Sequence, residues 1–283
     1  LWRDERMDSI IGLGAAGCRI AEKFSQYPQY DIYKMDVGLK RAPRTYGIKK
    51  AKTPEEFEES IGSLKRFFKP LGGEVLFIVG ASDFVSGASL RILEQIKDHG
   101  VSIMCICSDP ELLGEMDKMQ QRLTTAVFQQ YARSGVFKRV SLIYNNHLEN
   151  ILGDVPIIGF HDKLNDLLIS TVHMTNVLDH SESVMDNLSS PHEVSRLATY
   201  GIVDFDTGQE KLFFPIDSIR EKVYYYAINE NKLRESSDIR KKIISQIKEN
   251  SLDTKVSYGI YSTQYDEDYV YCLAYSSDIQ QLD

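Results

Sequence analysis

Runs of apolar residues alternate with helical patterns through the first half of the chain. The apolar runs occupy 9–13, 30–35, 74–80, 101–108 and 139–145, and each has the length of a buried strand. Helical periodicity lies between them, at 17–26, 54–68, 87–100 and from Asp109-Pro110 through Arg133. Because strands and helices that alternate in this way form crossover units, the pattern predicts a doubly wound α/β fold. We expect its sheet to be mostly parallel, with at least five strands.

Local signals place the ends of one of these helices. Thr53 and Glu56 form a capping box, and Pro54 occupies the first helical position, where its missing N–H costs nothing. We therefore expect a helix that begins at Pro54 and continues to about Phe68. The residue before Pro70 is forced out of the helical region, so the helix should end there.

The pattern changes in the second half. One long helical pattern runs from Pro156 to about Asp179 and predicts a connector helix, and the polar stretch at 179–193 predicts a loop or insertion. A strand, an Asp-Thr-Gly turn and another strand within 197–216 predict a hairpin. A strand in "KVYYYAIN", a helix at 237–250 and two strands at 255–263 and 268–277 follow. We expect an α/β domain at 7–155, a connector helix and loop at 156–200, and a smaller α+β C-terminal domain at 201–283.

Composition narrows the class of protein. Among 283 residues, 42% are hydrophobic and 26% charged, which predicts a folded chain, and no apolar run is long enough for a membrane span. The N-terminus has no apolar signal core, which argues against secretion, and the four cysteines form no CxxC pair, which indicates reduced thiols in a cytoplasm. The net charge of −8 argues against nucleic acid as a partner. His173 and His180 have no third ligand at metal spacing, so we expect no metal site of the protein's own.

The first strand leads into a loop with glycines at Gly12, Gly14 and Gly17. Glycines at this spacing let a backbone approach phosphate at a helix N-terminus, and Asp36 lies 19 residues after Gly17, near where a Rossmann enzyme binds a ribose hydroxyl. These two features favour NAD. The alternative is that the small residues only let a strand and a helix pack closely.

The loop, the order of the elements and the small second domain together resemble the FtsZ/tubulin superfamily of self-assembling GTPases, over most of the chain. FtsZ begins with a strand and a loop of the form GxGGxGCN. "GLGAAGCR" at 12–19 is similar to it, with Ala15 replacing a glycine and Arg19 the asparagine. The resemblance implies that the following residues contact nucleotide: Gly12, Gly14, Ala15, Ala16, Gly17 and Cys18.

Further matches follow in the family's order. "KMDVGLK" around Asp36 resembles the second loop, so this carboxylate is compatible with either nucleotide. "CSDPEL" and "YNNHL" resemble two later strand ends and imply roles for Asp109 and Asn145. On the connector helix, Phe160 and Asn165 are the nearest counterparts of the residues that stack on guanine and read its edge, one residue further apart than in the family. "KVSYGIYSTQYDEDYVYCLAYSS" resembles the last hairpin of the C-terminal domain.

The second phosphate loop departs from the family. FtsZ has a run resembling GGGTGTG after the third strand, whereas this chain has "VGASDFVSGAS", in which only Gly80, Ser86 and Gly87 correspond. Asp83 and Phe84 occupy the middle, where a carboxylate repels phosphate and a side chain hinders close approach. Either the loop bends away and leaves room for nucleotide at Ser86 and Gly87, or the pocket is vestigial.

Hydrolysis in the family requires an acidic loop after the connector helix, which reaches the nucleotide of the next subunit. Its form is Asn-x-Asp-Phe-x-x-Asp. "GIVDFD", with Asp204 and Asp206, resembles it but lies far downstream of the connector helix. The alternative is "TNVLDHSES", with Asp179 and Glu182, which is better placed but poorer in pattern. Either pair of carboxylates can also be ordinary surface residues.

The resemblance implies a divergent, compact relative, such as a phage or plasmid homologue, in the cytoplasm of a bacterium or a phage-infected host. We expect head-to-tail self-association into a filament or scaffold that binds GTP or GDP with Mg²⁺, with hydrolysis weak or lost. The chain ends at Asp283, so we expect no FtsZ-type C-terminal partner peptide. Two alternatives stay open: a structural protein on the same fold that binds no nucleotide, and an NAD-binding Rossmann enzyme.

Overall fold

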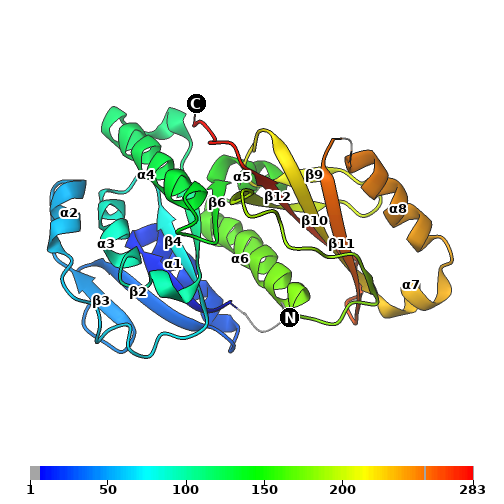
Figure 1. Ribbon diagram of the computed structural model, residues 1–283, viewed down its shortest axis with the longest axis horizontal. Helices are drawn as coiled ribbons and strands as arrows, with labels where there is room; N and C mark the ends of the chain where they lie inside the picture. The colour runs from blue at the N-terminus through cyan, green and yellow to red at the C-terminus, as the bar shows by residue number, and fades with distance from the viewer. Residues whose placement is uncertain (1–6, 252, 283) are drawn as a thin grey trace.

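A computed structural model describes residues 7–251 and 253–282 and shows one continuous mixed sheet covered by helices (Figure 1). Its order is β3-β2-β1-β4-β5-β6-β8-β12-β10-β11-β7, with β9 paired to β8. The strands from β3 to β6 are all parallel. The sheet continues into the second half through a short parallel contact of β6 with β8, where Val140 pairs with Leu197. The predicted doubly wound, mostly parallel fold with an α+β second half is confirmed.

The elements of the first half lie close to where the apolar pattern predicts them. The strands are β1 (Met7–Leu13), β2 (Asp31–Val37), β3 (Thr45–Ile48), β4 (Glu74–Gly80), β5 (Val101–Cys107) and β6 (Arg139–Tyr144). The helices are α1 (Gly14–Lys23), α2 (Pro54–Ser60), α3 (Ser89–Leu93), α4 (Glu115–Arg133) and α5 (Asn145–Leu152), with short 3₁₀ turns η1 (Phe24–Gln26), η2 (Phe84–Ala88), η3 (Lys97–His99) and η4 (Pro110–Leu112). The apolar pattern missed only short elements, β3 and α5.

Two predicted helices of the first half are wrong in extent. The helix expected to reach Phe68 begins at Pro54, as its cap indicates, but ends at Ser60 because Ile61 is extended. The segment at 87–100 is not one helix but η2, α3 and η3 in succession. Here Gly87 packs against the backbone of Pro54, and a Cβ at that position would lie 2.3 Å from the Pro54 oxygen. Contact with α2 therefore favours a tight 3₁₀ turn over a regular helix.

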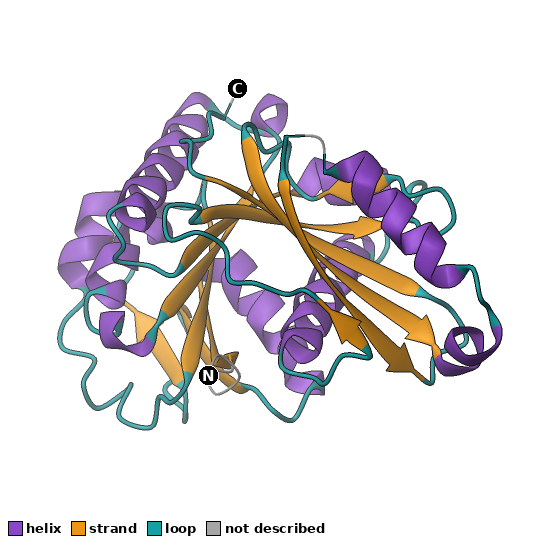
Figure 2. Ribbon diagram, turned by 45° about the vertical axis from the view of Figure 1, so that its right-hand side comes forward, coloured by secondary structure: helices purple, strands orange, loops and turns teal. Residues whose placement is uncertain are grey.

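Helices cover both faces of the first half of the sheet (Figure 2). Residues of α2, α3 and α4, including Phe57, Ile92 and Phe128, pack in one apolar cluster with alternate residues of β1 and β4. Residues of α1, α5 and α6 (Phe160–Asp179) pack in a second cluster on the other face. The strands are apolar on both faces for this reason, as parallel crossover topology requires.

The second half carries β7 (Met185–Asp186), β8 (Leu197–Val203), β9 (Glu210–Leu212), β10 (Ile219–Asn229), β11 (Lys255–Thr263) and β12 (Tyr269–Ser276), with α7 (Glu230–Glu235) and α8 (Ile239–Asn250). The predicted hairpin at 197–216 is formed by β8 and β9. Along β10, Tyr225 faces the cluster of α6, while Tyr224 and Tyr226 face a third cluster under α8. Alternation of period two thus places the three tyrosines in two cores rather than in a base-stacking surface.

The expected closing hairpin is wrong. β11 and β12 do not pair with each other, because β10 lies between them, parallel to β11 and antiparallel to β12. A turn after a strand indicates a hairpin only where the two strands are neighbours. Here Asp268, which precedes β12, accepts a hydrogen bond from the backbone N–H of Asn229 at the end of β10 (3.0 Å).

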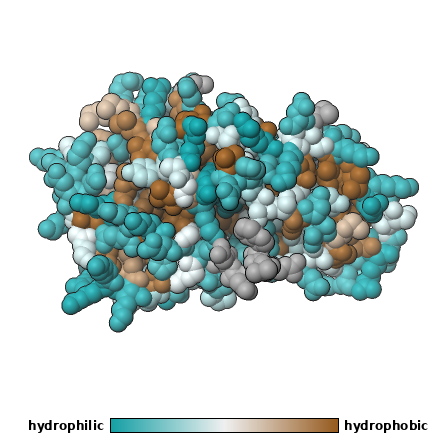
Figure 3. Space-filling model, in the orientation of Figure 1, coloured by the Kyte–Doolittle hydropathy of each residue, from teal (hydrophilic) through white to brown (hydrophobic). Residues whose placement is uncertain are grey.

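The connector helix α6 touches both halves. Its residues pack against β8, β10 and β12 as well as α1 and α5. Hydrophilic residues cover much of the face in Figure 3, and apolar residues gather at its upper left. Leu112 in η4 and Met116 and Met119 in the first turns of α4 are exposed. Within the described residues, none of the helices combines the length and apolar character needed to cross a membrane.

Candidate functional site

The carboxyl ends of β1, β2, β4, β5 and β6 meet at one edge of the sheet, because these strands are parallel neighbours. This edge, called here the carboxyl edge, is where ligands bind in open α/β sheets. It gathers most of the predicted nucleotide contacts: Gly12 near the end of β1, Gly14, Ala15, Ala16, Gly17 and Cys18 after it, Asp36 in β2, Ser86 and Gly87 after β4, Asp109 after β5 and Asn145 after β6.

The glycine loop forms a tight turn into α1. Gly14 begins the helix with φ of 73°, a conformation that favours glycine, and Leu13 precedes it in an extended conformation with no side-chain cap. Ala15 is exposed in the first turn. An uncapped first turn presents backbone N–H groups and the positive end of the helix dipole at the carboxyl edge. This part of the loop is suited to an anion.

The other two glycines have a packing reason. A Cβ on Gly12 would lie 2.3 Å from the Gly17 oxygen, and a Cβ on Gly17 would lie 2.3 Å from the Ile78 oxygen in β4. These glycines therefore let α1 pack directly on two strands. Close packing is sufficient to explain why glycine occupies positions 12 and 17, so Gly12 and Gly17 do not by themselves indicate a nucleotide site.

Two carboxylates lie near the glycine loop. The Asp83 Oδ2 atom is 3.2 Å from the position that a Cβ on Gly14 would take, while its Oδ1 accepts a hydrogen bond from the Val85 backbone N–H (3.2 Å). Burial raises the pKa of Asp36, the nearby charge of Asp83 adds to this, and a hydrogen bond from the Val37 N–H opposes it. The edge thus places negative charge where a phosphate would lie.

Cys18 stabilises the turn from within. Its thiol lies within hydrogen-bond distance of the carbonyl oxygens of Gly12 (3.3 Å) and Met35 (3.5 Å), in neighbouring strands. Burial raises the pKa of the Cys18 thiol to about 12. A protonated, donating thiol joins α1 to β1 and β2, which gives this residue a structural role at the loop.

The predicted second phosphate loop turns inward. The Ser86 hydroxyl is buried and lies within hydrogen-bond distance of Thr124 Oγ1 (3.0 Å) and of Gln120 Nε2 (2.9 Å), both on α4. Gly87 faces the backbone of Pro54. Ser86 is therefore occupied by contacts with α4 that the sequence analysis missed, because Gln120 and Thr124 follow only the periodicity of a buried helix face.

The remaining predicted contacts are more dispersed. Asp109 caps η4 by accepting from the Glu111 N–H (2.9 Å), and Asn145 is the first residue of α5. Phe160 packs against the apolar cluster of α6, and Asn165 is half-buried one turn later. The asparagine beside Asn145 carries the more unusual feature, since Oδ1 of Asn146 is buried with no hydrogen-bond partner among the described residues.

The two pairs of candidate catalytic carboxylates lie in different places. Asp204 accepts from the N–H groups of Asp206 (3.0 Å) and Thr207 (2.7 Å), which lowers its pKa and closes the β8–β9 turn. Asp206 forms an ion pair with Lys242 of α8 (2.6 Å). This pair is engaged in the turn and its contact with α8, four strands away from β1 in the sheet.

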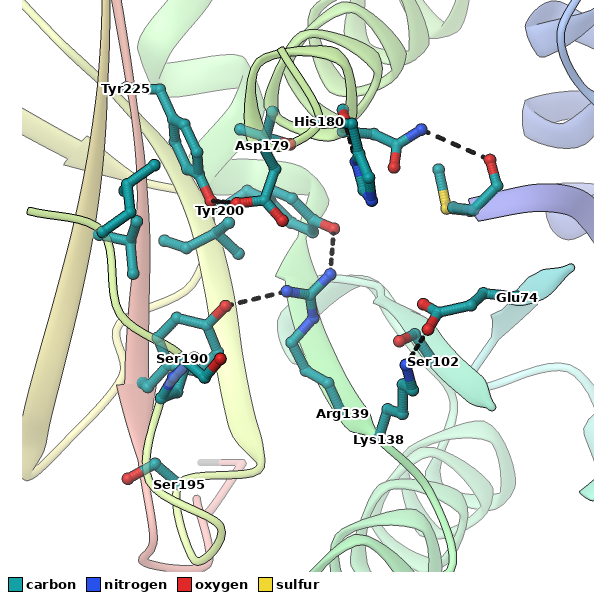
Figure 4. A pocket seen from close by; sticks show the side chains of 18 of the residues that line it. Glu74, Ser102, Lys138, Arg139, Asp179, His180, Ser190, Ser195, Tyr200 and Tyr225 are labelled. Atoms are coloured by element: carbon teal, nitrogen blue, oxygen red, sulfur yellow. Dashed lines mark hydrogen bonds and ion pairs between the residues drawn. The ribbon is translucent and has the colours of Figure 1, made fainter. Parts of the chain in front are cut away.

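Asp179 and Glu182 lie at the other end of the sheet from the glycine loop. Asp179 ends α6 and accepts from the Tyr225 hydroxyl (3.0 Å), as Figure 4 shows. One turn earlier, Asn176 Nδ2 lies 3.5 Å from the carbonyl of Met7, the first residue of β1. The glycine loop follows the other end of β1, about 20 Å away at a rise of about 3.3 Å per residue. A carboxylate near Asp179 is therefore too distant to act on the loop of its own chain.

Comparison with solved structures places the chain in the class of tubulin-like folds. It aligns with the empty FtsZ dimer of M. jannaschii over 97% of its own length and 89% of that chain, with a TM-score of 0.69 and 13% identity. A helical model of the TubZ-Bt four-stranded filament gives a TM-score of 0.73 at 14% identity, over 96% and 86%. CetZ from Methanosaeta thermophila gives 0.69 at 13% identity, over 96% and 87%. The chain has the FtsZ/tubulin fold.

No protein-family model matches the chain, and no curated protein sequence matches it. The likeness to FtsZ, TubZ and CetZ therefore rests on three-dimensional arrangement at low identity, and it establishes the fold.

Proposed function

We propose that the chain is a divergent FtsZ/tubulin-like protein that assembles head-to-tail into a cytoplasmic filament or scaffold, in a bacterium or a phage-infected host. One observation carries the proposal: nearly the whole chain aligns with proteins whose structures are described as protofilaments and filaments. Because the alignment spans both halves and the connector helix, it supports a role in assembly for the whole fold and not for the first half alone.

The separation of the glycine loop from Asp179, at opposite ends of the parallel strands, supports a head-to-tail contact. The glycine loop lies at the carboxyl edge, and Asp179 lies at the opposite edge, so stacking of one copy on the next would bring these features together. Such a contact joins two different surfaces of the same chain, and it propagates into a filament if the rotation does not close. Asp179 and Glu182 would then reach the nucleotide of the neighbouring copy, which makes them better placed for hydrolysis than Asp204 and Asp206.

An exposed apolar pair supports the position of the contact. Ile157 and Ile158 are 94% and 95% exposed in the loop between α5 and α6. This loop leads into the N-terminal end of α6, the end remote from Asp179 and therefore on the side of the carboxyl edge. Two adjacent isoleucines in full contact with water are costly, and a second copy covering them would remove that cost.

We propose that the uncapped first turn of α1, at Ala15, Ala16 and Gly17, holds the phosphate of GTP or GDP weakly. Asp36 and Asp83 oppose the anion, and Mg²⁺ bound with the nucleotide would offset part of their charge. TubZ, which has this fold, is known in a GTPγS form. Hydrolysis is weak or lost on this proposal, because the second loop offers no row of free glycine amides.

A second candidate is a scaffold that uses the same fold without nucleotide. The inward contacts of Ser86 with Gln120 and Thr124 favour it. An NAD-binding Rossmann enzyme is the third, and only the glycine loop and Asp36 favour that function.

Sedimentation velocity over a range of protein concentrations, with and without GTP and Mg²⁺, tests assembly. We expect larger species at higher concentration, and a strictly monomeric profile under every condition would contradict the proposal. The double variant Ile157→Ser/Ile158→Ser should weaken assembly, whereas Leu123→Ser, which removes exposed apolar surface from the flank of α4, should not. A thermal-shift panel with GTP, GDP and NAD separates the three candidates, since a ligand that binds only the native state raises Tm.

A further inference from the structure

A cavity of about 740 Å³ lies between the two halves of the molecule, at the opposite end of the sheet from the glycine loop. Its walls come from the first residues of β4, β5 and β6, from α6, from the segment at 181–196 and from β8, β10 and β12. Val75, Val172, Val223 and Leu273 supply apolar surface. A volume of this size is typical of sites for small organic ligands.

Arg139, the first residue of β6, lies in the middle of this cavity wall (Figure 4). Its guanidinium donates from Nη2 to the Tyr200 hydroxyl (2.9 Å) and from Nη1 to the Tyr275 hydroxyl (3.0 Å). The guanidinium carbon also lies 5.4 Å and 6.0 Å from the centres of these two rings. Both tyrosines are almost fully buried, so the side chains around the cation are held in place.

The cation has no carboxylate partner among the described residues. The acidic groups nearby are engaged elsewhere: Glu74 pairs with Lys138, and Asp179 accepts from Tyr225, as Figure 4 shows. No carboxylate oxygen of the described chain lies within 4.0 Å of a guanidinium nitrogen of Arg139. Arg139 is half-buried, and a charge that is partly removed from water without a counter-ion destabilises a protein. An arginine with no carboxylate partner among the described residues therefore calls for an explanation.

The hydrogen bonds to Tyr200 and Tyr275 do not use all of the N–H donors of Arg139. A guanidinium has five N–H donors, and two of them are used by Tyr200 and Tyr275, which leaves three. One of the three is on Nε, which is buried without a partner. The phenol oxygens of Tyr200 and Tyr275 accept hydrogen bonds from Arg139, so their own O–H groups can donate. Neither O–H group has an acceptor among the described residues. Burial raises the pKa of Tyr275 although Arg139 opposes this, so that phenol keeps its proton at neutral pH.

We propose that this cavity binds a small organic anion, with its carboxylate or phosphate group on Arg139, Tyr200 and Tyr275 and its apolar body against the aliphatic wall. The anion supplies both the missing counter-charge and the acceptors for the spare donors. Because the ligand touches β6 and α6 on one side and β8, β10 and β12 on the other, it joins the two halves of the molecule. The site is separate from the glycine loop, and it does not depend on whether nucleotide binds there.

Three probes of one size test the site: 2-naphthoate, 2-naphthyl phosphate and the neutral 2-naphthamide. Binding to the full chain is measured by isothermal titration calorimetry and by thermal shift. We expect at least one of the two anions to bind and to raise Tm, with the amide at least about tenfold weaker, because hydrogen bonds to a charged group are lost. The stronger of the two anions identifies the headgroup as carboxylate or phosphate.

Variants assign the binding to these residues. Arg139→Gln should weaken the anion at least about tenfold, whereas Arg220→Gln, which removes the same charge from an exposed position, should bind as the wild type does. If Arg139→Gln fails to fold, the double variant Tyr200→Phe/Tyr275→Phe keeps both rings and removes only the donors, and it should weaken binding as well. Failure of both anions to bind the wild type at millimolar concentration overturns the proposal, as does equal binding to the wild type and the folded variants.

Discussion

Replacement of Asp83 by asparagine is the most direct test of what the second loop does to nucleotide binding. Asparagine has the same size, and its Oδ1 can still accept the hydrogen bond from the Val85 N–H that the Asp83 carboxylate accepts. The variant therefore removes a charge near the glycine loop and leaves the start of η2 in place. We expect Asp83→Asn to bind GTP more tightly than the wild type.

The position of Asp83 gives the size of the effect. Because Oδ2 lies 3.2 Å from where a Cβ on Gly14 would be, a phosphate on the first turn of α1 would lie at about 5 Å from the carboxylate. Asp83 is exposed, so the screening of water applies, and each pair of unit charges repels by about 0.8 kcal/mol. Two phosphate charges give about 1.6 kcal/mol, which corresponds to a gain in affinity of roughly fifteenfold.

The assay is equilibrium binding of a fluorescent GTP analogue at low and high salt, for the wild type, Asp83→Asn and Asp98→Asn. Asp98 lies in η3, before β5, at the opposite end of the sheet, so its removal makes the same change in net charge without touching the loop. The gain should be largest at low salt, because screening weakens the repulsion. Equal affinity of the three proteins would refute the electrostatic argument, and no binding by any of them would refute the nucleotide site itself.

Three further predictions concern residues at the same edge, two on stability and one on thiol reactivity. Gly17→Ala should lower Tm by roughly 3–5 °C without any nucleotide, because its Cβ would overlap the Ile78 carbonyl and overpacking costs about 2–3 kcal/mol. The control Gly62→Ala has open space around its Cβ and should change Tm little. An unchanged Tm for Gly17→Ala would contradict the packing. Burial raises the pKa of Asp36, so the native state binds a proton more tightly than the unfolded state, and Asp36→Asn should raise Tm at pH 7 with a gain that fades as the pH falls toward 3.8; a gain independent of pH would exclude this cause. Cys18 should react with iodoacetamide at pH 8 far more slowly in the native protein than in urea, because its pKa of about 12 leaves little thiolate, and mass spectrometry of the labelled chain measures this.

Strand positions were predictable because they depend on local pattern. The apolar run at 74–80 coincides with β4, and the capping box places the start of α2 at Pro54, since both signals lie within a few residues of one another. The same locality explains why the carboxyl edge was found: in a parallel sheet, strand ends place Asp36, Asp109 and Asn145 on one side without further information. Helix lengths were less predictable, because η2 follows the contact of Gly87 with Pro54, which lies 33 residues earlier.

By itself, the sequence determined the doubly wound sheet, the connector helix and the glycine turn into α1, because apolar periodicity and positive-φ glycines act over neighbouring residues. Only the tertiary structure decided which polar groups have partners. Ser86 meets Thr124 at a separation of 38 residues, and Arg139 meets Tyr200 and Tyr275 at separations of 61 and 136. No periodicity encodes such contacts, since they arise when separate elements pack. They show that the second loop turns inward and that an arginine with no carboxylate partner among the described residues lies in the wall of the cavity between the two halves.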